Sequence, residues 1–186
     1  MRQSRITTVL SLALLVLTLG LTAGQPQPPR GKKAADALKA MLGTWEGTAT
    51  INLPNGETMT IRQTERVGTM LDGQIVMVEG RGYNDAGDLV FNALGVISHN
   101  PSTDAWEMRS YTGGQSGTHT FEPTDDGFVW SVDNAAGRVR YSATIDGETW
   151  TQVGELLVEG REPRKTIEMD LKRTGDCDWP AAGAID

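Results

Sequence analysis

Residues 43–67 have the sequence GTWEGTATINLPNGETMTIRQTERV, and this stretch decides the fold. From Trp45 to Leu53, apolar or small residues occupy every second position, and polar residues lie between them. The same alternation covers Thr58–Val67, after the pair Asn55-Gly56, which favours the left-handed backbone of a tight hairpin. A period of two gives a strand one apolar face and one polar face. The stretch therefore predicts two antiparallel strands joined by a short turn.

Eight later segments continue this pattern: Gln74–Tyr83, Leu89–Ser98, Ala105–Tyr111, Gly117–Glu122, Phe128–Val132, Arg138–Ile145, Thr149–Val158 and Lys165–Arg173. Turns rich in glycine, asparagine and aspartate separate them, and no connection is long enough for the crossover helix that parallel strands need. A long meander avoids exposed edges by closing on itself. We therefore predict an all-β protein, an antiparallel up-and-down barrel of about ten strands. An open sheet or a two-sheet sandwich is the alternative.

One short helix is expected over residues 34–42, before the first strand. Leu38, Met41 and Leu42 have helical spacing among good helix-forming residues, and Gly43 is suited to end the helix. The barrel domain is therefore assigned to residues 34–175, and residues 176–186 form a polar tail. The tail holds Cys177, the single cysteine of the chain, so neither an internal disulfide nor a thiolate metal cluster is possible.

The N-terminal segment has the layout of a secretory signal peptide. Arg2 and Arg5 precede an uncharged apolar run over residues 6–21, and small residues follow up to Gly24. The alternative is a membrane anchor, but a span needs roughly 20 apolar residues, more than this run provides. We expect residues 1–24 to be a cleaved signal peptide and residues 25–33 to form a flexible Pro-rich spacer. The mature protein is then expected to be periplasmic or extracellular, with no membrane span.

The charge of the chain bears on its partners. The net charge is −7, and removal of residues 1–24, which hold two arginines and no acidic residue, lowers it to −9. Proteins that bind nucleic acid need a basic surface to neutralise phosphates, so no nucleic-acid partner is expected.

Several polar residues are candidates for the barrel interior, which is wide enough in a ten-stranded barrel to hold a cavity. Glu65 shares a strand face with Ile61 and Val67, and Glu79 and Arg81 share a face with residues such as Met77. One alternative is that Glu79 and Arg81 only form an ion pair with each other. The other is that the pair faces water, with the alternation of this strand misread by one residue. The candidate ligand-binding residues are Trp45, Glu65, Met77, Glu79, Arg81, Tyr83, Arg109 and Tyr111, with Met108 as a further wall residue.

Signals for catalysis and cofactors are weak. The chain has two histidines, His99 and His119, without the spaced partners of a zinc site, and it has no glycine-rich phosphate loop or nucleophile elbow. No catalytic residue, metal or cofactor is therefore assigned. If the protein is an enzyme, Glu65 and Glu79 are the candidate general bases.

Five short motifs carry a resemblance to known barrels: Gly43-Thr44-Trp45-Glu46-Gly47, Val78-Glu79-Gly80-Arg81-Gly82-Tyr83, Ala93-Leu94-Gly95-Val96-Ile97-Ser98, Arg109-Ser110-Tyr111 and Gly154-Glu155. The first resembles the Gly-x-Trp opening of lipocalin and calycin barrels. Together they resemble a family of uncharacterised bacterial proteins, many of them secreted, with a lipocalin-like barrel of unknown function. The resemblance implies the fold. The haem-binding nitrobindin-like barrels are similar in architecture, but their haem needs an axial histidine from a late strand, and no histidine follows His119.

Three hypotheses for function follow. The first is a binding protein that holds a small, largely apolar ligand in the barrel. The second is an isomerase or hydrolase that uses an inward carboxylate as its base. The third is an interaction or structural module of the cell envelope with a packed, ligand-free barrel.

Overall fold

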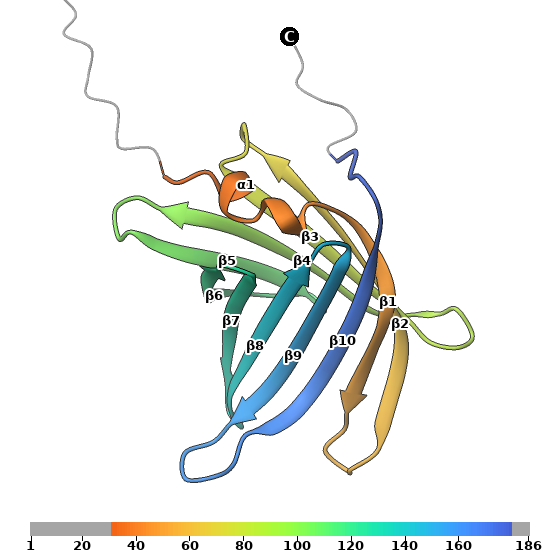
Figure 1. Ribbon diagram of the computed structural model, residues 1–186. Coiled ribbons are helices and arrows are strands. Elements are labelled where there is room, and N and C mark those ends of the chain that lie inside the picture. The colour runs from red at the N-terminus through yellow and green to blue at the C-terminus, as the bar shows by residue number, and fades with distance from the viewer. Residues whose placement is uncertain (1–30, 180–186) are drawn as a thin grey trace, which may run out of the picture.

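A computed structural model describes residues 31–179 and shows a closed barrel of ten antiparallel strands (Figure 1). This confirms the predicted fold class. Each strand pairs with its neighbours in the chain, and the first pairs with the last. The strands are β1 (Gly43–Asn52), β2 (Thr58–Met70), β3 (Ile75–Tyr83), β4 (Leu89–Asn100), β5 (Ala105–Thr112), β6 (Gln115–Thr124), β7 (Gly127–Asn134), β8 (Gly137–Asp146), β9 (Thr149–Leu157) and β10 (Arg164–Gly175).

Pairing between β1 and β10 closes the ring. It runs from Thr44 opposite Gly175 to Ile51 opposite Ile167, and the side-chain amide of Asn52 adds a 3.2 Å hydrogen bond to the Lys165 carbonyl oxygen. Closure leaves no open sheet edge, which removes the unpaired backbone groups that promote aggregation.

The predicted signal peptide, most of the spacer and residues 180–186 lie outside the described residues. Over residues 31–179, no helix has both the length and the apolar character needed to cross a bilayer.

The helix predicted over residues 34–42 is two shorter pieces. An α-helical turn, α1 (Ala34–Ala37), ends at Leu38, and a 3₁₀ turn, η1 (Lys39–Met41), follows it. Residues three apart eclipse each other in a 3₁₀ turn, so Leu38 and Met41 both face the barrel, where each is buried. The two turns therefore cover one end of the barrel (Figure 1).

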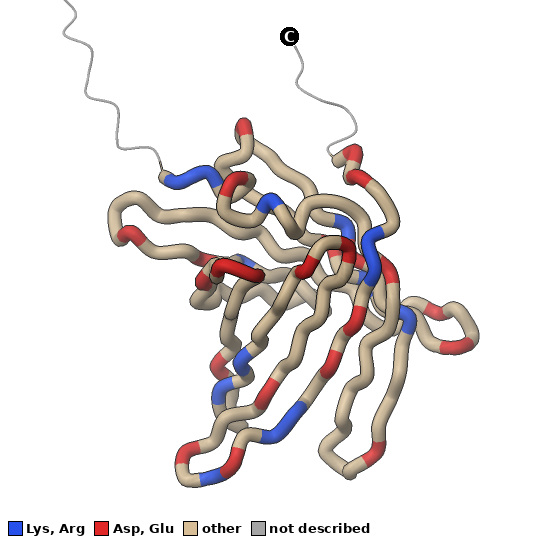
Figure 2. Tube along the Cα trace, in the orientation of Figure 1, with Lys and Arg blue, Asp and Glu red and all other residues tan. Residues whose placement is uncertain are grey.

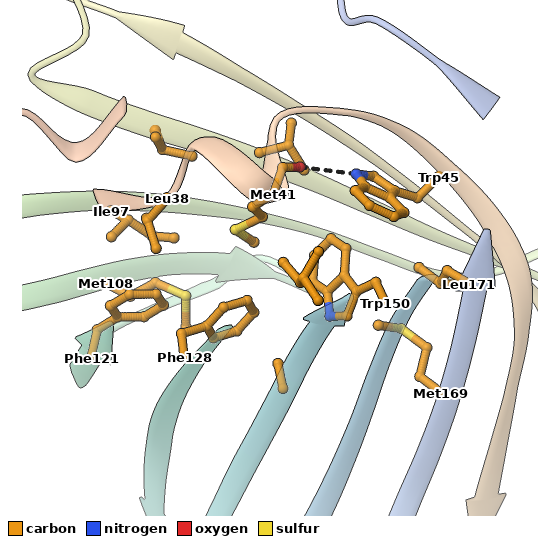
Figure 3. Packing of buried hydrophobic residues seen from close by; sticks show 14 of the residues in the cluster. Leu38, Met41, Trp45, Ile97, Met108, Phe121, Phe128, Trp150, Met169 and Leu171 are labelled. Carbon is orange, nitrogen blue, oxygen red and sulfur yellow. Dashed lines mark hydrogen bonds between the residues drawn. The ribbon is translucent and has the colours of Figure 1, made fainter. Parts of the chain in front are cut away.

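The barrel end beneath the helix is packed with aromatic side chains (Figure 3). The indole of Trp45 meets that of Trp150 edge-on, with ring centroids 5.7 Å apart, and Phe128 meets Trp150 at the same separation. The Trp45 Nε1–H donates a 2.9 Å hydrogen bond to the carbonyl oxygen of Met41. Trp45 thus joins the first strand to the helical cap and to β9, two strands away around the ring.

Acidic and basic positions are interspersed along the strands (Figure 2). Pairs such as Arg62–Glu46, at 3.3 Å, and Arg140–Glu155, at 3.0 Å, join neighbouring strands. These pairs are partly exposed, and each contributes at most about 1 kcal/mol to stability. The interior must therefore supply most of the stability.

Replacement of Trp45 by alanine tests the packed end. We expect Trp45→Ala to lower the free energy of unfolding by about 3–5 kcal/mol, because it leaves a cavity and removes the hydrogen bond to Met41. Urea denaturation measures the change. Tyr111→Ala is the control, because Tyr111 is 48% exposed on the outer face and should change stability by only about 0.5 kcal/mol. Equal losses in the two variants would contradict this assignment of the core.

Candidate ligand-binding cavity

The barrel interior contains a cavity of about 750 Å³ that is partly open to solvent. Its lining extends from core residues such as Met41 and Trp150, below the helical cap, to Ser116 and Asn134 beside the β5–β6 and β7–β8 turns. Most of the lining is apolar, and a few polar side chains project into it. This size and character are typical of sites for small molecules.

Glu65 lies in the wall of this cavity, as the alternation along β2 predicted. Its neighbours on the same face, Ile61, Gln63 and Val67, are all buried. The side-chain amide of Gln63 donates a 2.7 Å hydrogen bond to Glu65 Oε1. Burial raises the pKa of the Glu65 carboxyl to about 7, and the negative charge of Glu79 adds to this, while the Gln63 hydrogen bond opposes it.

The carboxylate of Glu65 fits because the facing residue on β3 is glycine. Glu65 pairs with Gly80, and a Cβ atom on Gly80 would lie 2.8 Å from Glu65 Oε1. Gly82 has the same role one step further along, where a Cβ atom would lie 2.5 Å from the Ile61 Cδ1 atom. The bare inner face of β3 is therefore the space into which side chains of β2 lean.

This arrangement corrects the prediction of which β3 residues face the barrel interior. Because Gly80 and Gly82 face inward, Glu79, Arg81 and Tyr83 face outward. The structure therefore agrees with the alternative interpretation, in which the Glu79–Arg81 pair lies on the outside of the barrel. The prediction placed the larger side chains of this segment inside. The barrel instead places its glycines inside, because a neighbouring strand fills the space above them.

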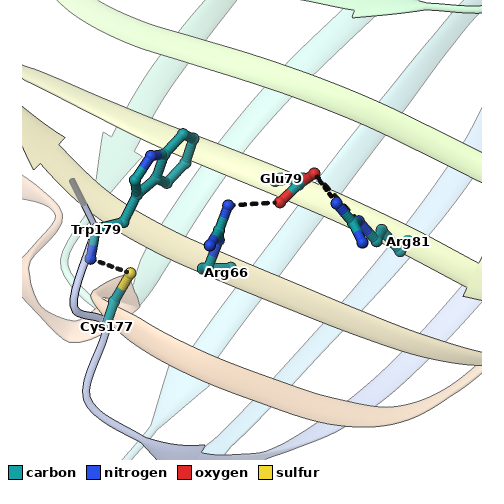
Figure 4. Close-up of polar contacts among 5 residues, drawn as sticks. All are labelled: Arg66, Glu79, Arg81, Cys177 and Trp179. Carbon is teal, nitrogen blue, oxygen red and sulfur yellow. Dashed lines mark hydrogen bonds and ion pairs between the residues drawn. The ribbon is translucent and has the colours of Figure 1, made fainter. Parts of the chain in front are cut away.

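On the outer face, Glu79 is held by two arginines (Figure 4). Arg66 Nη2 donates to Glu79 Oε2 at 3.0 Å, and Arg81 Nη2 donates to Glu79 Oε1 at 2.6 Å. The Arg66 guanidinium also lies over the indole of Trp179, 4.6 Å from its ring centroid. The cluster therefore attaches the start of the C-terminal tail to the barrel wall.

The remaining predicted residues divide between the two faces. Met77, Arg109 and Tyr111 lie on the outer face, one position away in each strand from the cavity-lining Val78, Ser110 and Thr112. Trp45 faces inward within the packed end, and the wall candidate Met108 lines the cavity. Of the eight candidates, Glu65 lines the cavity and Trp45 packs against its lining residue Trp150.

Sequence reasoning missed two polar and aromatic pairs in the cavity wall. Ser110 Oγ and His119 Nε2 are 2.8 Å apart, and burial lowers the pKa of His119. Trp130 and Tyr141 stack in parallel, with ring centroids 4.0 Å apart, and burial raises the pKa of Tyr141. Inward glycines were the available signal, because a Cβ atom on Gly117 would meet the His119 ring and one on Gly154 would meet the Tyr141 ring.

The residues of the cavity do not form a metal centre. Over residues 31–179, no cluster of three or more histidine, cysteine or acidic side chains is placed to hold a metal ion. His119 has a serine as its hydrogen-bond partner, and its ring lies 5.9 Å from that of Trp130.

Comparison with known proteins identifies the fold. No protein-family model and no curated protein matches the chain. Among solved structures, the crystal structure of Rv2717c from M. tuberculosis is similar, with a TM-score of 0.58 and 15% sequence identity. The match covers 77% of this chain and 98% of that one. At this identity the similarity shows a shared barrel architecture.

The raised pKa of Glu65 predicts a specific pH dependence of stability. The unfolded chain releases this proton near the ordinary pKa of 4.5, whereas the folded protein keeps it until about pH 7. Between these values the unfolded state binds fewer protons, so the Glu65 contribution to stability falls as pH rises and is constant above pH 7. The decrease is on the order of 3 kcal/mol.

Glu65→Gln should remove this dependence, because an amide keeps the cavity geometry and does not ionise. We expect the free energy of unfolding of Glu65→Gln, minus that of the wild type, to rise between pH 4.5 and pH 7. Urea denaturation across this range measures it. Glu155→Gln, on the outer face beside Arg140, is the matched control and should show no such rise. A constant difference for Glu65→Gln would show that the carboxyl titrates normally.

Proposed function

We propose that this chain is an exported protein that binds a small, largely apolar molecule in the barrel cavity. The observation that carries the proposal is the cavity itself, about 750 Å³ in volume, with an apolar wall and a few converging polar groups. Such a wall favours ligands that bury apolar surface, at about 25 cal/mol for each Å² removed from water. The polar groups would orient the ligand.

Export rests on the sequence of residues 1–24, which has the basic start, apolar run and small residues of a signal peptide.

The hypothesis of an interaction module required a barrel filled by its own side chains. The cavity instead leaves space inside the barrel. The interior therefore favours a binding protein over a packed module.

A neutral fluorescent probe, N-phenyl-1-naphthylamine, tests the proposal. We expect its emission to rise on addition of the protein and to saturate at one probe per chain. Val78→Phe should weaken binding by about tenfold or more, because Val78 lines the cavity and a phenyl ring would fill part of it.

The matched control is Met77→Phe, one residue away on the outer face of β3. It adds the same ring outside the cavity and should leave probe binding unchanged. If the wild type does not bind the probe, or if both variants weaken binding equally, the cavity is not the binding site.

A second candidate function is proton transfer to or from the bound ligand. The observation that favours it is Glu65, a carboxyl group in the cavity wall whose pKa is raised to about 7 by burial. A general base works best with a pKa near the working pH. Glu79 does not share this role, because it is paired with two arginines on the outer face.

The probe reaction for this function is the ring opening of 5-nitrobenzisoxazole. Glu65 would take the C3 proton while the N–O bond breaks to give a nitrile and a phenolate, whose absorbance reports the rate. We expect the rate to rise with pH up to about 7 and to fall by about a hundredfold or more in Glu65→Gln. A rate unchanged by Glu65→Gln would exclude Glu65 as a base.

A further inference from the structure

The charged residues that line the cavity are acidic. Among the described residues, the lining includes two carboxylates, Glu65 and Asp133, and no lysine or arginine. His119 is the one lining group that could carry a positive charge near neutral pH, and burial lowers its pKa. In the described residues, lysines and arginines form ion pairs with acidic residues that do not line the cavity. The exception is Arg138, which pairs with Asp133.

The two carboxylates differ in their partners. Asp133 accepts two hydrogen bonds from Arg138, at 2.7 Å to Nε and 3.1 Å to Nη2, so its charge is compensated within the protein. Within residues 31–179, the hydrogen bond recorded for Glu65 comes from the neutral amide of Gln63. An ionised Glu65 is therefore a buried charge that a cation would stabilise, since buried charges are costly unless they are paired.

The opposite wall offers a surface for the rest of a ligand. Strand β7 is five strands from β2 in either direction around the ten-stranded ring, so Trp130 on β7 lies across the barrel from Glu65. Trp130 stacks on Tyr141 of β8, with their rings nearly parallel at 9°, and both line the cavity. This pair supplies a largely apolar surface against which an aromatic or aliphatic group can pack.

We infer that the cavity selects hydrophobic amines: the ligand's ammonium group donates to the carboxylate of Glu65, and its apolar body packs against Trp130 and Tyr141. This inference rests on the proposed binding function and names the ligand class of that site. It excludes fatty acids and other hydrophobic anions as preferred ligands, because their charge would meet Glu65, and the described lining holds no lysine or arginine to receive it.

Three ligands with the same ring and spacer test the inference: 1-naphthylmethylamine, 1-naphthalenemethanol and 1-naphthylacetic acid. Calorimetry with the purified protein at pH 8 should show the amine binding about tenfold or more tighter than the alcohol, since hydrogen bonds to charged groups are among the strongest. The acid should bind more weakly than the alcohol.

Glu65→Gln is the decisive variant. It should bring the affinities for the amine and the alcohol to within about threefold of each other, while the alcohol still binds. Retained alcohol binding shows that the variant is folded with its cavity intact. Glu155→Gln, on the outer face, should keep the amine preference.

The amine preference should also grow between pH 5.5 and pH 8, because Glu65 gains its charge over this range. The groups around Glu65 are the neutral Gln63, the backbone of Gly80 and, on the outer face, Glu79 with its two arginines. Within the cavity, Asp133 is paired with Arg138, and His119 could repel an amine at low pH. The His119→Gln variant separates the two causes and should keep the pH dependence.

The outcomes distinguish this inference from the function on which it rests. If the alcohol binds but the amine binds no tighter, or if Glu65→Gln keeps the amine preference, the inference is wrong and the binding function stands. If the acid binds best, the inference is also wrong. If neither N-phenyl-1-naphthylamine nor any of the three ligands binds, the binding function itself fails.

Discussion

Closure of the sheet by β1 and β10 is the constraint on which the rest of the structure depends. In a closed ring, every residue of every strand faces either the interior or the outside, and the direction of one residue fixes that of its partners on both sides. Glu65 inside therefore requires Gly80 inside and Glu79 outside. The same geometry brings polar residues from well-separated strands, such as Glu65 and His119, into one cavity.

The barrel interior is densely packed at one end and holds the cavity towards the other. Beneath the helical cap, large side chains such as Trp45 and Phe128 fill the space and stabilise the fold. Towards the far turns, inward glycines let neighbouring side chains lie along the wall, and this leaves room in the centre. One polar consequence is Glu65, whose burial costs stability as its charge forms. A binding or catalytic role would explain why such a cost is tolerated at this position.

The strand pattern and turn chemistry predicted the all-β class, the antiparallel order and nearly all strand positions, because alternation and hairpin turns are local properties. The inward direction of Glu65 was also predictable, since Ile61 and Val67 on its face are clearly apolar. The inward face of β3 was not predictable, because both faces of this strand carry apolar residues. One face carries Met77 and Tyr83, and the other carries Val76 and Val78 followed by two glycines. Which face points inward depends on the β2 side chains that pack over those glycines. Such contacts between strands cannot be read from the sequence of β3 alone. Ser110 with His119 and Trp130 with Tyr141 were missed for the same reason, since each pair joins two strands.

Native mass spectrometry of the protein purified from its own host tests the central claim, that the cavity holds a small molecule, most directly. The account predicts a folded population heavier than the chain by the mass of one small molecule, released on unfolding and diminished in Val78→Phe but not in Met77→Phe. A folded protein that carries only the mass of its own chain, in the wild type and in both variants, would contradict it.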